Sequence, residues 1–157
     1  MRKLLKNLKK IEQLYKNIND TDVEKLLLKL AFLEFAGWIE NSLDTIYINI
    51  AKNDELLQKQ IQEHINKCYS FDYEKIKGCI CFCIGINNCI NIERKIKESD
   101  LQMFKSSLKT IKNQRNELAH NSIYGTLANY LNFSEIKKHL KIIYFGLLQI
   151  KKYLNQV

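Results

Sequence analysis

Apolar residues recur at intervals of three and four through most of the chain, a spacing typical of amphipathic helices. In the first segment these positions are Leu4, Leu8, Ile11, Tyr15 and Ile18. They predict a helix over residues 2–18, followed by a helix that is capped by Asp20 or Thr21 and runs to about Ala51. Because the middle of the second segment is apolar almost all round, we expect that helix to be central and buried.

Two further helices are predicted in the middle of the chain. Residues 54–69 form a more polar segment, and residues 72–98 continue through an apolar, Cys-rich stretch to a charged end. The part from Cys79 to Ile86 also has the composition of a strand. One short strand would have no partner here, so we interpret it as helical.

The last two predicted helices carry long apolar stripes. Asp100 precedes the first stripe, whose members are Leu101, Phe104, Leu108, Ile111, Arg115 and Leu118. A loop is expected over about residues 121–132, which contain Gly125, and Ser134 is expected to cap the final helix. The final stripe consists of Ile136, Leu140, Ile143, Leu147, Ile150 and Leu154. The pattern predicts an all-α protein, an antiparallel bundle of about five or six helices in a single domain over residues 1–157.

The composition agrees with an all-α protein and gives the chain a net positive charge. The chain has no Pro, only 5 Gly and 46% hydrophobic residues, which favours a globular helical protein over a turn-rich β protein. The net charge of +8 suits neutralisation of phosphates on RNA or DNA. Lys, Ile, Asn and Tyr are all abundant, as in proteins from AT-rich genes, so the charge alone favours nucleic-acid binding only modestly.

The sequence lacks the patterns of secreted and membrane proteins. The first 16 residues are studded with Lys and have no apolar signal core. The apolar run from Leu26 to Ile39 is interrupted by Lys29 and Glu34 and is too short to span a bilayer. We therefore expect a cytoplasmic protein with reduced thiols and no membrane contact.

The cysteines do not have the spacing of a metal site. Cys79, Cys81 and Cys83 are separated by single residues, with Cys89 nearby, whereas zinc ligands usually pair at gaps of two to four residues. On a helix only Cys79 and Cys83 would share a face. We interpret these residues as buried, inert thiols and predict neither a metal nor a cofactor.

Two charged residues interrupt apolar surfaces. Arg115 occupies a position in an apolar stripe, where it needs a buried acidic partner or an interface or cleft. Glu34 lies in the most apolar segment, about two turns before Asn41 on the same face. Glu34 either pairs with a Lys or holds Arg115 in position, and in the second interpretation Glu34 and Asn41 support the site.

A polar flank accompanies the Arg115 stripe. It consists of Lys105, Lys109, Lys112, Asn116 and His120. A solvated Lys face is common on surface helices. Such a row can also guide RNA phosphates towards a general base, which makes the three lysines candidate RNA contacts. His64 and His139 are expected at the surface without a catalytic role.

The run from Arg115 to His120, RNELAH, resembles the Arg-x4–6-His motif of HEPN domains, including the polar residue that often follows the Arg. The apolar segment around Glu34 is similar to the early helix of that family. The resemblance implies a helical bundle that dimerises around the motif helices, so that Arg and His from two copies line one cleft. Active members cut RNA without metal, and many are toxins or act in phage defence, whereas other members only bind.

The resemblance implies a metal-independent endoribonuclease with Arg115, Asn116 and His120 as its catalytic residues. His120 suits a general base that takes the proton of the RNA 2′-hydroxyl, and Arg115 suits stabilisation of the charge on the phosphorane. Asn116 would orient the phosphate or the imidazole. The expected partners are RNA, a second copy of the chain, and an antitoxin or other regulatory protein. HEPN toxins that are silenced by adenylylation carry a Tyr two residues after the His, whereas this chain has Ser122 there and its nearest Tyr is Tyr124.

Helical geometry separates the two main candidates. On an ideal helix His120 lies about 140° around the axis from Arg115. Either the helix ends or distorts near Ala119, or the residues line opposite flanks of a dimer cleft. Two other interpretations remain: a dimeric HEPN-like module that binds nucleic acid or protein without cutting, and a structural bundle in which Arg115 pairs with Glu34.

Overall fold

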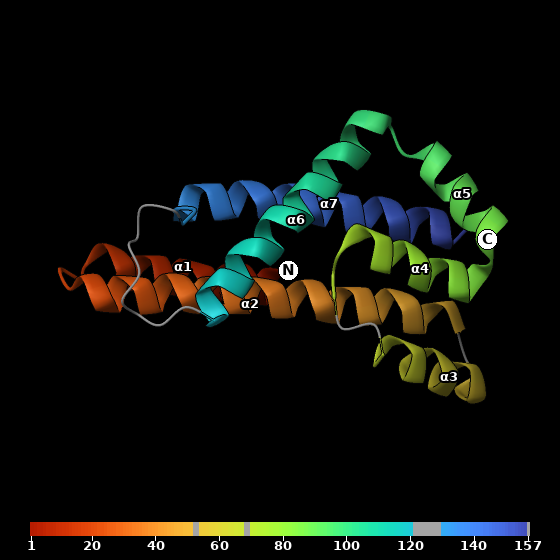
Figure 1. Cartoon of the computed structure of the whole chain (residues 1–157), viewed down its shortest axis with the longest axis horizontal. Helices are drawn as coiled ribbons and strands as arrows, with labels where there is room; N and C mark the ends of the chain where they lie inside the picture. The colour runs from red at the N-terminus through yellow and green to blue at the C-terminus, as the bar shows by residue number, and fades with distance from the viewer. Residues whose placement is uncertain (52–53, 68–69, 121–129, 157) are drawn as a thin grey trace. The chain divides into compact units, whose positions relative to one another are not determined.

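The computed structural model describes residues 1–51, 54–67, 70–120 and 130–156, and of His120 only the backbone. The regular elements of these segments are all helical, as predicted (Figure 1). They are α1 (Arg2–Lys16), α2 (Thr21–Ile48), the 3-10 turn η1 (Asn49–Ala51), α3 (Glu55–Ile65), α4 (Tyr73–Ile84), α5 (Ile86–Lys95), α6 (Glu98–His120) and α7 (Phe133–Leu154). The described part thus holds seven α-helices, so the expected number of five or six was wrong.

The additional helix arises at Gly85, where the chain turns sharply between α4 and α5 (Figure 1). Gly85 has φ of 80°, in the left-handed region that residues with a Cβ rarely adopt. The amide of Gly85 still donates to the carbonyl of Cys81, which closes α4 before the turn. The prediction of one helix over residues 72–98 was therefore wrong, although the Cys-rich stretch is helical as expected.

Helix starts follow from local side-chain caps. Asp20 Oδ1 accepts hydrogen bonds from the amides of Asp22 and Val23 at 2.9 and 3.3 Å, which confirms Asp20 as a cap of α2. At α7 the cap is Asn132, whose Oδ1 accepts from the Glu135 amide at 3.0 Å, while Glu135 Oε2 accepts from the Asn132 amide at 2.8 Å. This reciprocal capping box replaces the predicted cap at Ser134, which is exposed within the helix.

The chain divides into two compact units, residues 1–38 with 110–141 and residues 39–109 with 142–157. The helices α2, α6 and α7 each contribute to both units. The core of the first unit includes Leu4, Leu8, Ile11, Phe32, Phe35, Ile111, Ile136 and Leu140. The core of the second unit includes Ile39, Ile61, Phe71, Ile76, Phe104, Leu108, Ile143 and Leu147. The expectation of a single domain over residues 1–157 stays a prediction.

Residues on both halves of α2 enter these cores, in agreement with its apolar sequence. Within the described residues, no helix combines the length and apolar character needed to cross a membrane.

Candidate functional site around Arg115

Arg115 lies on α6 between two buried positions of the apolar stripe, Ile111 and Leu118, and is itself half-buried. Its Nη1 donates a hydrogen bond to Oδ1 of Asn116 at 3.1 Å. The neighbouring side chain therefore helps to hold the guanidinium at the edge of the core. Gln114 on the same turn accepts from the Leu131 amide at 3.1 Å, which ties this end of α6 to the residues that precede α7.

The helix containing Arg115 continues without a break to His120, its last residue. Ala119 is helical, and α6 ends one residue after it, so the expected helix end near Ala119 agrees with the backbone. On an ideal helix a separation of five residues corresponds to about 140° around the axis. The side chain of His120 and residues 121–129, with Ser122, Tyr124 and Gly125, lie outside the described part of the chain.

Glu34 lies half-buried on α2, where its Oε2 accepts a hydrogen bond from Asn7 Nδ2 of α1 at 2.9 Å. The described contact of Glu34 thus joins the first two helices, and its predicted role in orienting Arg115 stays a prediction. Asn41 is exposed further along α2, and its backbone carbonyl accepts from Thr45 Oγ1 at 2.8 Å. Glu34 belongs to the first unit and Asn41 to the second.

The three predicted RNA-binding lysines of α6 have different surroundings. Lys105 lies with its Nζ 4.3 Å from the ring centroid of Tyr73 and 4.0 Å from Glu93 Oε1. Lys109 is exposed and Lys112 is half-buried. Lys105 is thus engaged by an acid and an aromatic ring, which leaves less of its charge for a ligand.

Lys105 belongs to a network that joins α4, α5 and α6. Glu93 accepts from Tyr73 Oη at 2.7 Å and from Lys77 Nζ at 2.6 Å. Burial alone would raise the pKa of Glu93, but the hydrogen bonds from Lys77 and Tyr73 outweigh it and lower that pKa. Burial and the Glu93 contact raise the pKa of Tyr73, so its hydroxyl stays protonated and acts as a hydrogen-bond donor. Sequence analysis missed this network.

The cysteines are less uniformly buried than predicted. Cys79 and Cys89 are buried, whereas Cys81 and Cys83 are half-buried. Burial raises the pKa of Cys83 to about 11, and burial with a contact to Cys81 raises that of Cys89 to about 12. Both thiols are therefore protonated, and unreactive as nucleophiles, at neutral pH. The described residues contain no group of three or more His, Cys, Asp or Glu placed to hold a metal ion.

His64 and His139, which were expected at the surface, are half-buried. His64 stacks on Phe82 with ring centroids 3.9 Å apart. Burial and the nearby charge of Lys138 lower the pKa of His139. Neither the stacking of His64 nor the lowered pKa of His139 indicates a catalytic role.

A pocket of about 640 Å³ lies in the second unit, but it contains none of the predicted site residues. It is lined by Ile46, Asn49, Ile50, Cys83, Ile84, Lys151, Leu154 and Asn155.

Comparison of the chain with protein-family models, curated proteins and solved structures found no match.

Proposed function

We propose that the protein is a HEPN-like, metal-independent endoribonuclease whose site is centred on Arg115, Asn116 and His120. The observation that carries this proposal is the Arg115–Asn116 hydrogen bond at a half-buried edge of α6, one turn before His120 ends the same helix. A guanidinium at the margin of a core suits charge-assisted binding of a phosphate. The Arg-x4-His spacing places an imidazole on the same segment.

The chemistry uses the nucleophile that RNA carries itself. His120 takes the proton of the 2′-hydroxyl as this oxygen forms a bond to phosphorus, and the bond from phosphorus to the 5′-oxygen breaks. Arg115 stabilises the charge on the equatorial oxygens, and the leaving 5′-oxygen gains a proton from solvent or from a second imidazolium. The products are a 2′,3′-cyclic phosphate and a 5′-hydroxyl, and DNA is left intact because it lacks the 2′-hydroxyl.

We further propose that two copies of the chain complete the site, because one regular helix cannot bring Arg115 and His120 to the same point. The face of α2 within the first unit offers a candidate surface for the second copy. Leu26, Leu30 and Leu33 are 44–45% exposed and fall within an arc of about 60° together with Gly37. A Cβ built on Gly37 would meet no atom within 4 Å, so a helix could approach closely there.

A cleavage assay in EDTA tests the activity. We expect the wild-type protein to cut single-stranded RNA, and His120→Ala to lower the rate by roughly 10²–10⁴-fold through loss of the base. Arg115→Ala should lower it by about 10²–10³-fold. Arg94→Ala, which removes an exposed guanidinium from α5, is the matched control and should leave the rate unchanged. Cleavage that persists in purified His120→Ala would refute the assignment.

The alternative is a HEPN-like dimeric module that binds nucleic acid or a protein partner without cutting. This alternative does not need the two side chains to meet, and on an ideal helix positions 115 and 120 lie about 140° apart. It predicts that RNA binds with a steep salt dependence but stays intact.

In the cell, the proposed activity fits a cytoplasmic toxin or phage-defence effector, held in check by an antitoxin or other regulatory protein. Growth arrest on expression, relieved by His120→Ala, is the expected phenotype.

A further inference from the structure

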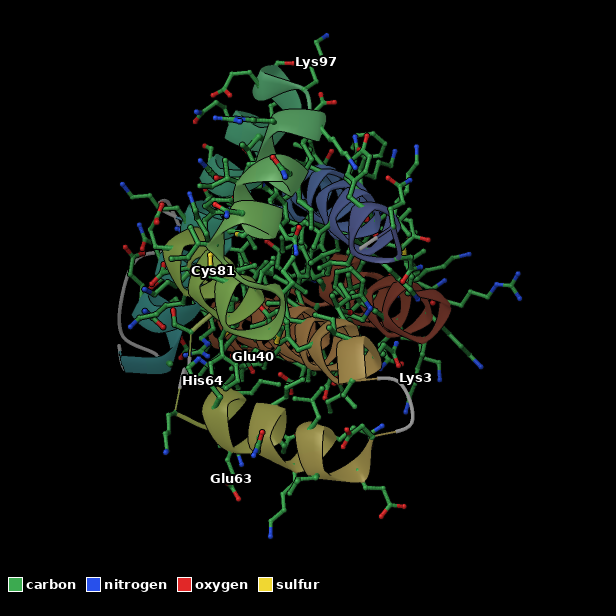
Figure 2. All side chains as sticks on the ribbon, turned by 90° about the vertical axis from the view of Figure 1, so that its right-hand side faces the viewer. Lys3, Glu40, Glu63, His64, Cys81 and Lys97 are labelled. Atoms are coloured by element: carbon green, nitrogen blue, oxygen red, sulfur yellow. The ribbon has the colours of Figure 1, made fainter. Side chains whose placement is uncertain are left out.

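The outer face of α1 carries a concentration of positive charge that the proposed catalytic site does not use. Its members are Arg2, Lys3, Lys6, Lys9 and Lys10, all exposed. At 100° per residue these five side chains fall within an arc of about 120°, and they extend over about 12 Å of helix. In Figure 2 nitrogen-tipped side chains, Lys3 among them, extend outward from the red ribbon of α1.

This basic face has no acidic partner in the described part of the chain. The single acid of α1, Glu12, lies outside the arc and pairs with Lys16 and Lys137. By contrast, Lys77 and Lys105 share Glu93, and Lys25 pairs with Asp22. The five cations of α1 are therefore free for an external anion.

The arrangement of positive charges on α1 lowers the stability of this helix. An ordinary solvated face would not have this unfavourable arrangement. Cations near a helix N-terminus oppose the macrodipole, and α1 has no acid in its first turn to offset Arg2 and Lys3. Lys6 also has like-charged neighbours three or four residues away on both sides, which destabilises a helix. Cations at the ends of α5 and α7, in contrast, lie where the dipole favours them.

One side of α1 is packed against the rest of the first unit. Leu4, Leu8 and Ile11 are 4%, 1% and 6% exposed. Asn7 bonds to Glu34 of α2, and the ring of Tyr15 packs on that of Phe133 with centroids 5.1 Å apart. The basic face is thus held on a rigid support, in the same compact unit as Arg115 and Asn116.

We propose that this face binds the phosphate backbone of single-stranded RNA, so that α1 serves as a substrate-binding surface separate from the α6 lysines. The choice of RNA rests on the proposed function. An anionic membrane fits less well, because Leu4, Leu8 and Ile11 of α1 are buried in the protein. The exposed Leu5 and Leu14 lie on opposite sides of the helix and form no continuous apolar face that could insert among lipid chains.

The test measures binding without cleavage, using a fluorescent 2′-O-methyl RNA oligonucleotide that lacks the attacking hydroxyl. Replacing Lys6 and Lys9 by Gln should weaken binding on the order of tenfold at physiological salt and reduce the salt slope by about 1.4. The same double variant should melt at the wild-type temperature or above, since like-charge repulsion is relieved. A merely structural role for the two lysines would lower the melting temperature instead.

The matched control removes the same charge elsewhere: Lys59→Gln with Lys97→Gln, two exposed lysines of the second unit, should bind RNA like the wild type. Equal losses in both double variants would show a general charge effect and overturn the proposal. Binding to phosphatidylserine vesicles that depends on Lys6 and Lys9, with no effect on RNA, would overturn it in favour of a membrane. Because the probe cannot be cut, failure of the nuclease assignment would leave a positive result here intact.

Discussion

At the scale of single residues, Gly146 of α7 lies directly against the ring of Phe104 of α6. A Cβ built at this position would overlap three atoms of the Phe104 ring, and Phe104 is 2% exposed. Position 146 therefore requires glycine, because the Phe104 ring leaves no room for a Cβ. Glycine is otherwise unfavourable in the interior of a helix.

Gly146→Ala is expected to destabilise the protein by about 1–3 kcal/mol, because the Phe104 ring must move within a packed core. Urea unfolding followed by circular dichroism would measure the change. The matched control is Gly78→Ala on α4, where a Cβ meets nothing within 4 Å. That substitution should stabilise by roughly 0.5–1 kcal/mol through helix propensity. Equal effects of the two substitutions would contradict the packing of α7 on Phe104.

At the scale of helices, the start of α7 depends on the reciprocal bonds between Asn132 and Glu135. Asn132→Ala should lower the free energy of unfolding by about 1 kcal/mol, because it leaves first-turn amides without an acceptor. Ser134→Ala, two residues later, should change it little. A larger loss for Ser134→Ala in the same thermal or urea unfolding experiment would favour the cap that the sequence suggested.

The sequence was sufficient to predict most helices but not where one of them breaks. The three/four spacing locates α1, α2, α6 and α7, since each helix buries one continuous stripe. The break at Gly85 was missed, because Ile and Cys continue on both sides of it and a lone Gly is tolerated in helices. The positive φ that ends α4 is a property of the folded backbone, and it does not change the pattern of apolar residues in the sequence.

The missed break explains why the contacts of Glu93 were not predicted. The turn between α4 and α5 lets Glu93 meet Tyr73 and Lys77, and Lys105 joins them. On one uninterrupted helix, residues 73 and 93 would lie about 30 Å apart. From the sequence, Lys105 was therefore expected in a solvated or RNA-binding row and not beside Glu93. The edge position of Arg115 was predictable from the stripe that it interrupts.

At the scale of the whole molecule, the proposed shared site requires a dimer. We expect light scattering at micromolar concentration to give twice the 18.6 kDa mass of one chain. Leu30→Glu places a charge in the exposed leucine stripe of α2 and should shift the mass to that of a monomer. Leu14→Glu, at a more exposed leucine of α1, is the control and should stay dimeric. A strictly monomeric wild type would refute the dimer.

The central claim is that Arg115 of one copy acts with His120 of the other, and a mixing experiment tests it most directly. Arg115→Ala and His120→Ala are each inactive by this account. In a random mixture about half of the dimers are mixed, and each mixed dimer keeps one of two Arg–His pairs. Mixing the two variants should therefore restore RNA cleavage to about a quarter of the wild-type rate. A mixture that forms mixed dimers yet stays as inactive as its components would contradict the shared site.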